Sequence, residues 1–128
     1  MRRDHADGWD LLGSRDRFKA SIVSAAAPNL SKGELMIKDE LLNLHAHILL
    51  APKLFQPKTD VLVLGAFGCG VFQNDPVNIA KHFAHLLSPQ FYYARLYDEI
   101  HFAIPPGTNY NSFVSVFQEE QLNPQVYQ

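Results

Sequence analysis

The sequence from Asp60 to Phe72 reads DVLVLGAFGCGVF, and this stretch predicts the centre of the fold. Residues 60–65 form an apolar run of the kind found in parallel strands that are covered on both faces. Residues 65–72 then place three glycines within six residues at the carboxyl end of that strand. Ligands of open α/β sheets bind outside the carboxyl ends of the strands, so this loop is the candidate site.

Upstream of this stretch, the sequence predicts a strand and a helix. Residues 21–25 (SIVSA) favour a short buried strand, which the turn residues Pro28 and Asn29 close. Ser31 and Glu34 match a capping box, and Leu30 and Leu35 are placed for a hydrophobic staple. The predicted helix runs from there to about Leu50, because Pro52 disfavours continuation.

Downstream, two more helices and one strand are expected. Asp75 is a good N-cap and Pro76 fits the first position of a helix that ends at Ser88-Pro89. Residues 99–104 alternate as a strand, with Ile100, Phe102 and Ile104 on one side. Asn109 or Asn111 is expected to cap a last helix. The apolar positions of the two helices are Ala80, Phe83, Ala84 and Leu87, and Phe113, Val114 and Phe117.

The alternation of strands and helices predicts an α/β domain with a largely parallel sheet, over residues 19–128. Residues 1–18 form a polar segment for which the sequence predicts no firm structure. Three strands make a very small sheet. Either residues 1–18 add a strand, or a sheet edge is left for another chain, such as a second copy, to cover.

Composition narrows the class of protein. The 128 residues carry a net charge of −2, which gives no general attraction to nucleic acid or to an anionic membrane. The apolar runs are too short to span a bilayer, and residues 1–5 lead into no apolar signal core, so a cytoplasmic protein is expected. Cys69 is the only cysteine, which excludes an internal disulfide.

Glycines in the 65–72 loop allow backbone amides to approach a phosphate, although the same glycines could merely turn a tight corner. The order G-x-x-G-x-G differs from the dinucleotide fingerprint G-x-G-x-x-G, and the G-K-[ST] sequence of a P-loop is absent. Because Asp75 already caps the next helix, a phosphate would sit on the amides of Gly68 to Phe72 rather than on the helix terminus.

The stretch GAFGCGVF at 65–72, followed by Asn74-Asp75-Pro76, resembles the second ligand loop of microbial-type poly(ADP-ribose) glycohydrolases, which have a macro-domain fold. Residues 24–30 and 100–104 and the 109–117 helix resemble neighbouring segments of that family. The resemblance implies a small three-layer macro-domain-like sheet with flanking helices, truncated on its N-terminal side.

By this resemblance, the loop would bind the diphosphate of ADP-ribose or a related nucleotide. The implied ligand-binding residues are Gly65, Ala66, Phe67, Gly68, Cys69, Gly70, Val71 and Phe72. Phe72 would lie against the distal ribose, and Phe67 would support the loop. The family's catalytic loop, a glycine run followed by Gln-Glu-Glu, has no counterpart here. Residues 118–120 (QEE) follow the last helix without a glycine run, and we interpret them as its solvated end.

Other chemistry-bearing residues give weak signals. His45 and His47 point to opposite sides of one helix and cannot bind one metal together. His82 and His85 share a face but lack a third ligand in sequence, so these two are interpreted as surface histidines. We expect no metal, no cofactor and no catalytic residue, and Cys69 is interpreted as a packed thiol. The aromatic residues Phe91, Tyr92, Tyr93 and Tyr97 favour core packing or an interface over base stacking.

Three functions remain open at this point. The first is an ADP-ribose-binding module related to a glycohydrolase but lacking its catalytic loop. The second is a structural or interaction protein that binds no nucleotide. The third is the C-terminal half of an active glycohydrolase.

Overall fold

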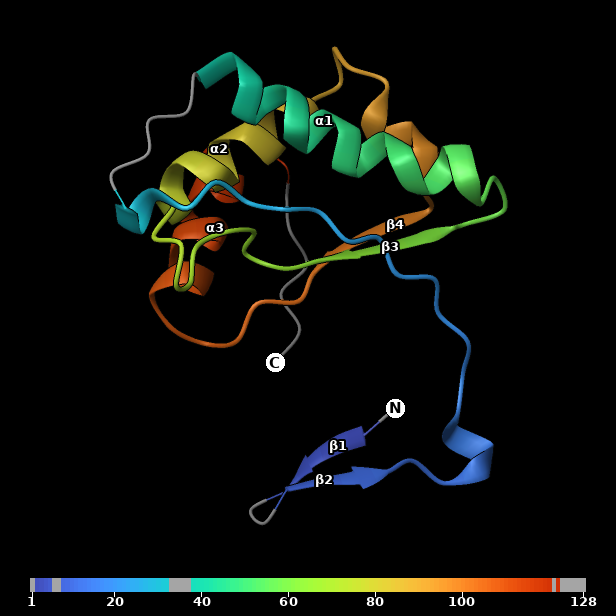
Figure 1. Cartoon of the computed structure of the whole chain (residues 1–128). Helices are drawn as coiled ribbons and strands as arrows, with labels where there is room; N and C mark the ends of the chain where they lie inside the picture. The colour runs from blue at the N-terminus through green and yellow to red at the C-terminus, as the bar shows by residue number, and fades with distance from the viewer. Residues whose placement is uncertain (1, 6–7, 33–37, 121, 123–128) are drawn as a thin grey trace.

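The computed structural model describes residues 2–5, 8–32, 38–120 and 122. This part of the chain forms a small α/β unit (Figure 1) with three helices, α1 (Lys38–Phe55), α2 (Pro76–Leu86) and α3 (Thr108–Glu119). Strand β3 (Val61–Leu64) pairs in parallel with β4 (Glu99–Phe102). The prediction of an α/β domain with a parallel sheet is therefore confirmed.

The parallel register places one face of the two strands against the helices. Leu62 pairs with Ile100 and Leu64 with Phe102, and Leu62, Leu64 and Phe102 pack on the helical core. Residues directly paired in a sheet share a face, so this register brings the apolar side chains of both strands together. The connection between β3 and β4 contains α2, as a parallel pair requires.

The core lies among the three helices. Phe83 of α2 is fully buried and stacks edge-on to Phe102 at a centroid distance of 5.4 Å. Phe113 and Phe117 of α3 meet the same ring. The other buried apolar side chains of this cluster are Leu49, Ile79, Ala80, Ala84, Leu86 and Val116. Replacement of Phe83 by alanine would cost about 3–5 kcal/mol, as large-to-small changes in cores do.

The opposite face of the sheet is open. Val61 and Val63 are 47 % and 63 % exposed, and their register partners on β4 are the polar residues Glu99 and His101. Among the described residues, the helices contribute their buried side chains to a single core cluster, which packs against the face of the sheet that carries Leu62, Leu64 and Phe102. The three-layer arrangement expected from the sequence is thus not formed by this part of the chain, because no element covers the Val61–Val63 side.

The strand predicted at residues 21–25 is not formed. This segment has no regular secondary structure, and Ile22 and Val23 are 89 % and 49 % exposed. It runs as an irregular trace between the N-terminal elements and the short turn Leu30–Lys32 (η2) (Figure 1). A strand needs a neighbour for its backbone N–H and C=O groups, and none of the strands that the structure describes pairs with these residues.

Helix α1 differs from its prediction at both ends. Leu30 and Ser31 lie in η2, where the Ser31 hydroxyl bonds to the Asn29 side chain. Their predicted partners, Leu35 of the staple and Glu34 of the capping box, lie outside the described residues. The helix also continues past Pro52 to Phe55, so the predicted stop at Leu50 is wrong. Pro52 is buried, and its carbonyl accepts from the Gln56 amide at 2.8 Å, which keeps the last turn closed.

The predicted N-cap is confirmed for α2 and is wrong for α3. Asp75 caps α2 by accepting from the Val77 amide at 3.0 Å, with Pro76 at the first helical position, as predicted. Helix α3 begins at Thr108 after Gly107, whose φ of +145° turns the chain, so neither predicted asparagine is its cap. The buried residues of α3 include Val116 rather than Val114, which is half-buried.

The N-terminal segment forms an antiparallel pair, β1 (Arg2–His5) and β2 (Gly8–Leu11), followed by the turn η1 (Ser14–Asp16). The pair does not join the β3–β4 sheet, so residues 1–18 do not extend it. In Figure 1 it lies apart from the helices. Across the described residues, no helix combines the length and apolar character that a bilayer crossing needs.

Candidate functional site

The glycine-rich loop connects the carboxyl end of β3 to α2 and is folded by its own backbone. The Phe67 amide donates to the Gly65 carbonyl at 3.0 Å, and the Cys69 amide donates to Ala66 at 3.1 Å. The Asn74 amide then closes the loop on the Gly68 carbonyl at 3.0 Å. Consecutive tight turns therefore hold residues 65–74 in one shape.

Gly68 lies on the closed side of this loop. Its φ of +73° belongs to the left-handed region that side chains disfavour. A Cβ at this position would lie 2.6 Å from Asn74 Nδ2 and 2.9 Å from the Cβ of Ala27. Glycine is required here for both backbone conformation and space.

Asn74 fastens the loop to the preceding chain. Its side chain is only 3 % exposed, and Nδ2 donates to the Pro28 carbonyl at 2.8 Å and to the Gly68 carbonyl at 2.9 Å. The Leu30 amide also donates to the Phe72 carbonyl at 2.9 Å. No role for the Asn74 side chain was predicted from the sequence. Its position, as a short polar residue between a glycine loop and a helix N-cap, is the signal that could have indicated this role.

Gly70 lies on the opposite, open side. A Cβ built on it would meet no atom within 4 Å, and the neighbouring Val71 and Phe72 are 86 % and 38 % exposed. Within the described residues, the amides of Gly70, Val71 and Phe72 donate to no acceptor of the protein. Consecutive free amides on a glycine turn form an anion-binding concavity.

Cys69 is held between these two sides as a neutral thiol. Its Sγ–H donates to the Phe67 carbonyl at 3.5 Å. Burial, and secondly the negative charge of Asp75, raise the pKa of this thiol to about 11. At neutral pH the thiolate fraction is therefore very small, which favours a packed thiol over a nucleophile.

Phe67 faces inward from the loop. It is half-buried, packs against the helical core, and meets the edge of the His45 ring at a centroid distance of 5.6 Å. The Asn109 side chain of α3 donates to the Cys69 carbonyl at 3.4 Å. The loop is thus supported from α1 and α3 as well as by its own turns.

The histidines are arranged differently from the sequence interpretation. His82 faces His45, with 3.2 Å between the two Nδ1 atoms, so it is not a plain surface histidine. His85 is exposed and lies against Phe91, as a surface residue would. The sequence could not predict the position of His82, because its contact residue His45 lies on another helix, 37 residues away in sequence. Among the described residues, no group of three or more potential metal ligands comes together.

The remaining sequence candidates lie away from the loop. Tyr97 is buried and donates to the Leu49 carbonyl at 2.7 Å, which confirms a packing role for this part of the aromatic cluster, whereas Tyr92 is exposed. Residues 118–120 are exposed at the end of α3, as interpreted.

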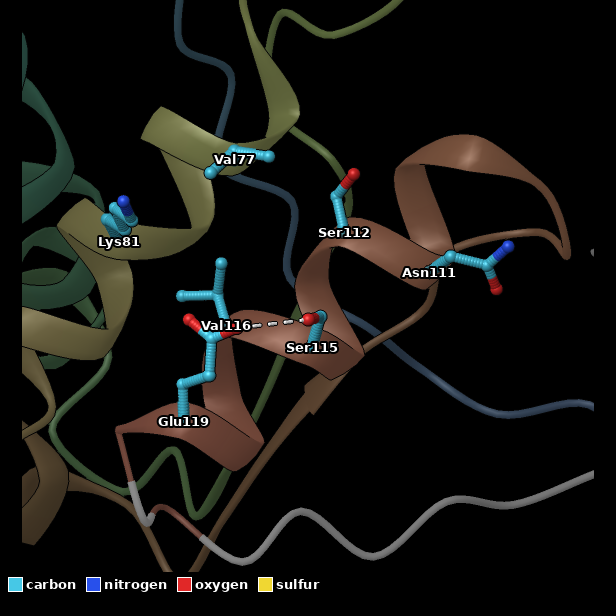
Figure 2. Close-up of a pocket in the computed structure, with 7 residues that line it drawn as sticks. All are labelled: Val77, Lys81, Asn111, Ser112, Ser115, Val116 and Glu119. Atoms are coloured by element: carbon cyan, nitrogen blue, oxygen red, sulfur yellow. Dashed lines mark hydrogen bonds between the residues drawn. The ribbon is translucent and has the colours of Figure 1, made fainter.

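A shallow cavity of about 380 Å³ lies between α2 and α3 (Figure 2), apart from the glycine loop. Three of its polar lining residues, Ser112, Ser115 and Glu119, form hydrogen bonds within α3. The Ser115 hydroxyl approaches Glu119 Oε1 at 3.4 Å, and the Ser112 hydroxyl donates to the Thr108 carbonyl at 3.0 Å. No residue of the 65–72 loop lines this cavity.

Comparison with known proteins supplies a fold relationship. No protein-family model matches the sequence, and no curated protein matches it significantly. Among solved structures, the apo poly(ADP-ribose) glycohydrolase of Deinococcus radiodurans matches at 26 % identity with a TM-score of 0.54. A T267K mutant of that enzyme in complex with ADP-ribose matches at 28 % identity with a TM-score of 0.51.

The chain shares part of the fold of a poly(ADP-ribose) glycohydrolase. Each match covers 65 % of this chain. It covers 34 % of the apo glycohydrolase and 32 % of the ADP-ribose complex, so the chain spans about a third of the length of these structures. The resemblance drawn from the GAFGCGVF stretch is confirmed at the level of structure.

Proposed function

We propose that the 65–72 loop binds ADP-ribose, or a related nucleotide diphosphate, through the free amides of Gly70, Val71 and Phe72. The observation that carries this proposal is the open side of the loop, where three successive amides donate to no acceptor among the described residues. A diphosphate supplies acceptors for such donors. The similarity to a glycohydrolase crystallised with ADP-ribose supports this choice of ligand.

Each loop residue has a part in this proposal. Gly70 leaves room for the diphosphate, since nothing lies within 4 Å of its Cβ position. Phe72, at 38 % exposure, offers an aromatic face for a ribose. The other residues of the proposed site, Gly65, Ala66, Phe67, Gly68, Cys69 and Val71, shape the loop or contribute backbone contacts.

Binding without hydrolysis is expected of this chain alone. Its sequence has no glycine run followed by Gln-Glu-Glu, and the carboxylates of Glu119 and Glu120 lie at the C-terminal end of α3. The C-terminal part of a complete glycohydrolase would carry the same loop. A hydrolysis assay on poly(ADP-ribose), run beside the binding experiment, tests this expectation, and hydrolysis by this chain alone would contradict it.

The test is calorimetric titration of ADP-ribose into the native chain and into Gly70→Glu. The glutamate would occupy the diphosphate position with a negative charge, so specific binding should be lost. Gly13→Glu is the matched control: it adds the same charge in the segment between β2 and η1, away from the loop. Adenosine, which lacks the diphosphate, should bind neither variant. Absence of binding to the native chain at millimolar ADP-ribose would overturn the proposal.

An interaction role is the second candidate, and the exposed sheet face favours it. Val61 and Val63 are apolar and open to solvent, and β3 has β4 as its one partner among the described strands. Unpaired strand edges and apolar faces invite another polypeptide. If this role holds, the chain self-associates in light scattering, and Val63→Lys abolishes the association.

A further inference from the structure

His45 and His82 join α1 to α2 directly beneath the glycine loop. His45 is fully buried, and its Nδ1 lies 3.2 Å from Nδ1 of His82. The other nitrogen of His45, Nε2, is buried without a hydrogen-bond partner among the described residues. Neither histidine belongs to the proposed ligand site.

The contact between two Nδ1 atoms depends on the protonation of both rings. It forms only when one nitrogen carries a proton and the other offers a lone pair. One added proton can be accommodated if the hydrogen bond reverses. Two added protons cannot, because two N–H groups and two positive charges would then face each other across 3.2 Å.

Among the described residues, the side chains in ring contact with His45 are Phe67, His82 and Phe83. Phe83 of α2 stacks on it at 4.7 Å, and Phe67 of the loop meets it edge-on at 5.6 Å. Along α1, the positions four before and four after it are leucines. His82 is the titratable group that faces it; of its neighbours on α2, Lys81 lines the α2–α3 cavity and His85 contacts Phe91. Burial, and secondly His82, lower the pKa of His45 to about 4.

We propose that the His45–His82 pair is an acid-sensitive link between the α1–α2 contact and the glycine loop. Protonation of both rings separates them and removes the ring on which Phe67 packs. The loop then loses its inward support, and its open side is no longer held in place. The effect on ligand binding rests on the function proposed above, whereas the link itself is a property of the protein without ligand.

The direction of the pH dependence follows from proton uptake. In the unfolded chain His45 titrates near its ordinary value of 6.5, while in the folded chain it stays neutral down to about 4. Unfolding therefore takes up a proton in this window. The contribution of neutral His45 to the free energy of unfolding is therefore fully present above pH 6.5 and is lost as the pH falls toward 4. The folding equilibrium constant should drop on the order of 100-fold across this window from this residue alone.

The first test is urea unfolding between pH 7 and 4, followed by far-ultraviolet circular dichroism. His45→Phe keeps a ring between Phe67 and Phe83 but cannot be protonated, so its stability should fall much less on acidification than that of the native chain. His82→Gln serves as a second variant if His45→Phe does not fold. His47→Gln, on the exposed side of α1, is the matched control and should keep the native pH dependence.

The second test observes the loop without ligand. In ¹⁵N-labelled protein, the amide resonances of Gly68 and Gly70 should shift as the pH falls from 7 to 4 in the native chain and in His47→Gln. They should not follow that titration in His45→Phe. An equal pH dependence of stability in native protein and His45→Phe would overturn the proposal, as would loop resonances that titrate alike in both. ADP-ribose binding at pH 7 is scored separately, so failure of the ligand proposal leaves these outcomes interpretable.

Discussion

Gly68 and Gly70 lie two residues apart in one loop, yet their surroundings are opposite. At Gly68 a methyl group would meet Asn74 and Ala27 at under 3 Å, and the backbone is left-handed. At Gly70 the same methyl group would meet nothing within 4 Å. One glycine is therefore needed by the fold, and the other leaves space for something outside it.

The two sides of the loop therefore differ in role: one contacts the rest of the protein, and the other faces solvent. On the closed side, Asn74 and the turn at Leu30 hold the loop to the preceding chain. On the open side, the amides of Gly70, Val71 and Phe72 have no acceptor among the described residues, and they are the proposed ligand contacts. Substitutions on the two sides should therefore separate stability from binding.

The largest effect is expected for Gly68→Ala. The left-handed φ costs about 1–2 kcal/mol for a residue with a Cβ, and the overlap with Asn74 adds a comparable amount, so about 3 kcal/mol of stability should be lost. Urea unfolding measures this loss, and ADP-ribose binding should weaken with it. A stability within error of the native chain would mean that the closed side is looser than described here.

Asn74→Ala should follow, at about 2 kcal/mol, because it removes the side-chain donor to the part-buried Pro28 carbonyl and one of the two donors to the Gly68 carbonyl. Asn74→Asp should be no better, since a carboxylate would face the same two carbonyls. Unfolding curves of both variants test this expectation. Rescue of stability by the aspartate would show that the amide donors are not the source of the effect.

Gly70→Ala should leave the free energy of unfolding within about 0.5 kcal/mol of the native value, as an open surface substitution does. Its affinity for ADP-ribose should nevertheless fall several-fold, because a methyl group enters the space left for the diphosphate. The comparison with Gly68→Ala is informative in both directions. Equal losses of stability at the two glycines would remove the distinction between the sides.

The smallest effect on binding is expected for Cys69→Ala, because the thiol is neutral and faces the Phe67 carbonyl. The raised pKa, about 11, also predicts slow alkylation by iodoacetamide at pH 7 that accelerates as the pH rises toward 11. The unfolded chain should react much faster at the same pH. Rapid alkylation of the folded protein at pH 7 would contradict the environment described for this thiol.

The sequence was sufficient where a local signal decides the structure. Residues 61–64 are apolar without interruption, and Asp75-Pro76 combines a side-chain cap with a fixed φ, so β3 and the start of α2 followed from a few residues each. The GAFGCGVF stretch also pointed to the related fold, through its resemblance to a loop of poly(ADP-ribose) glycohydrolases.

The rest depends on contacts between distant segments. Residues 21–25 have a strand-like composition, but no strand among the described residues pairs with them. Pro52 remains helical because packing offsets its missing donor. The Asn74 bonds to Pro28 and the His45–His82 contact join residues 46 and 37 positions apart, and no local pattern encodes such pairs.

The most direct test of the two-sided loop is a ¹⁵N-detected titration of the native chain with ADP-ribose at pH 7. The account predicts that the amides of Gly70, Val71 and Phe72 shift most, because they become hydrogen-bonded to the diphosphate, while that of Gly68 shifts less. Shifts confined to the α2–α3 cavity, or none at saturating ligand, would contradict it.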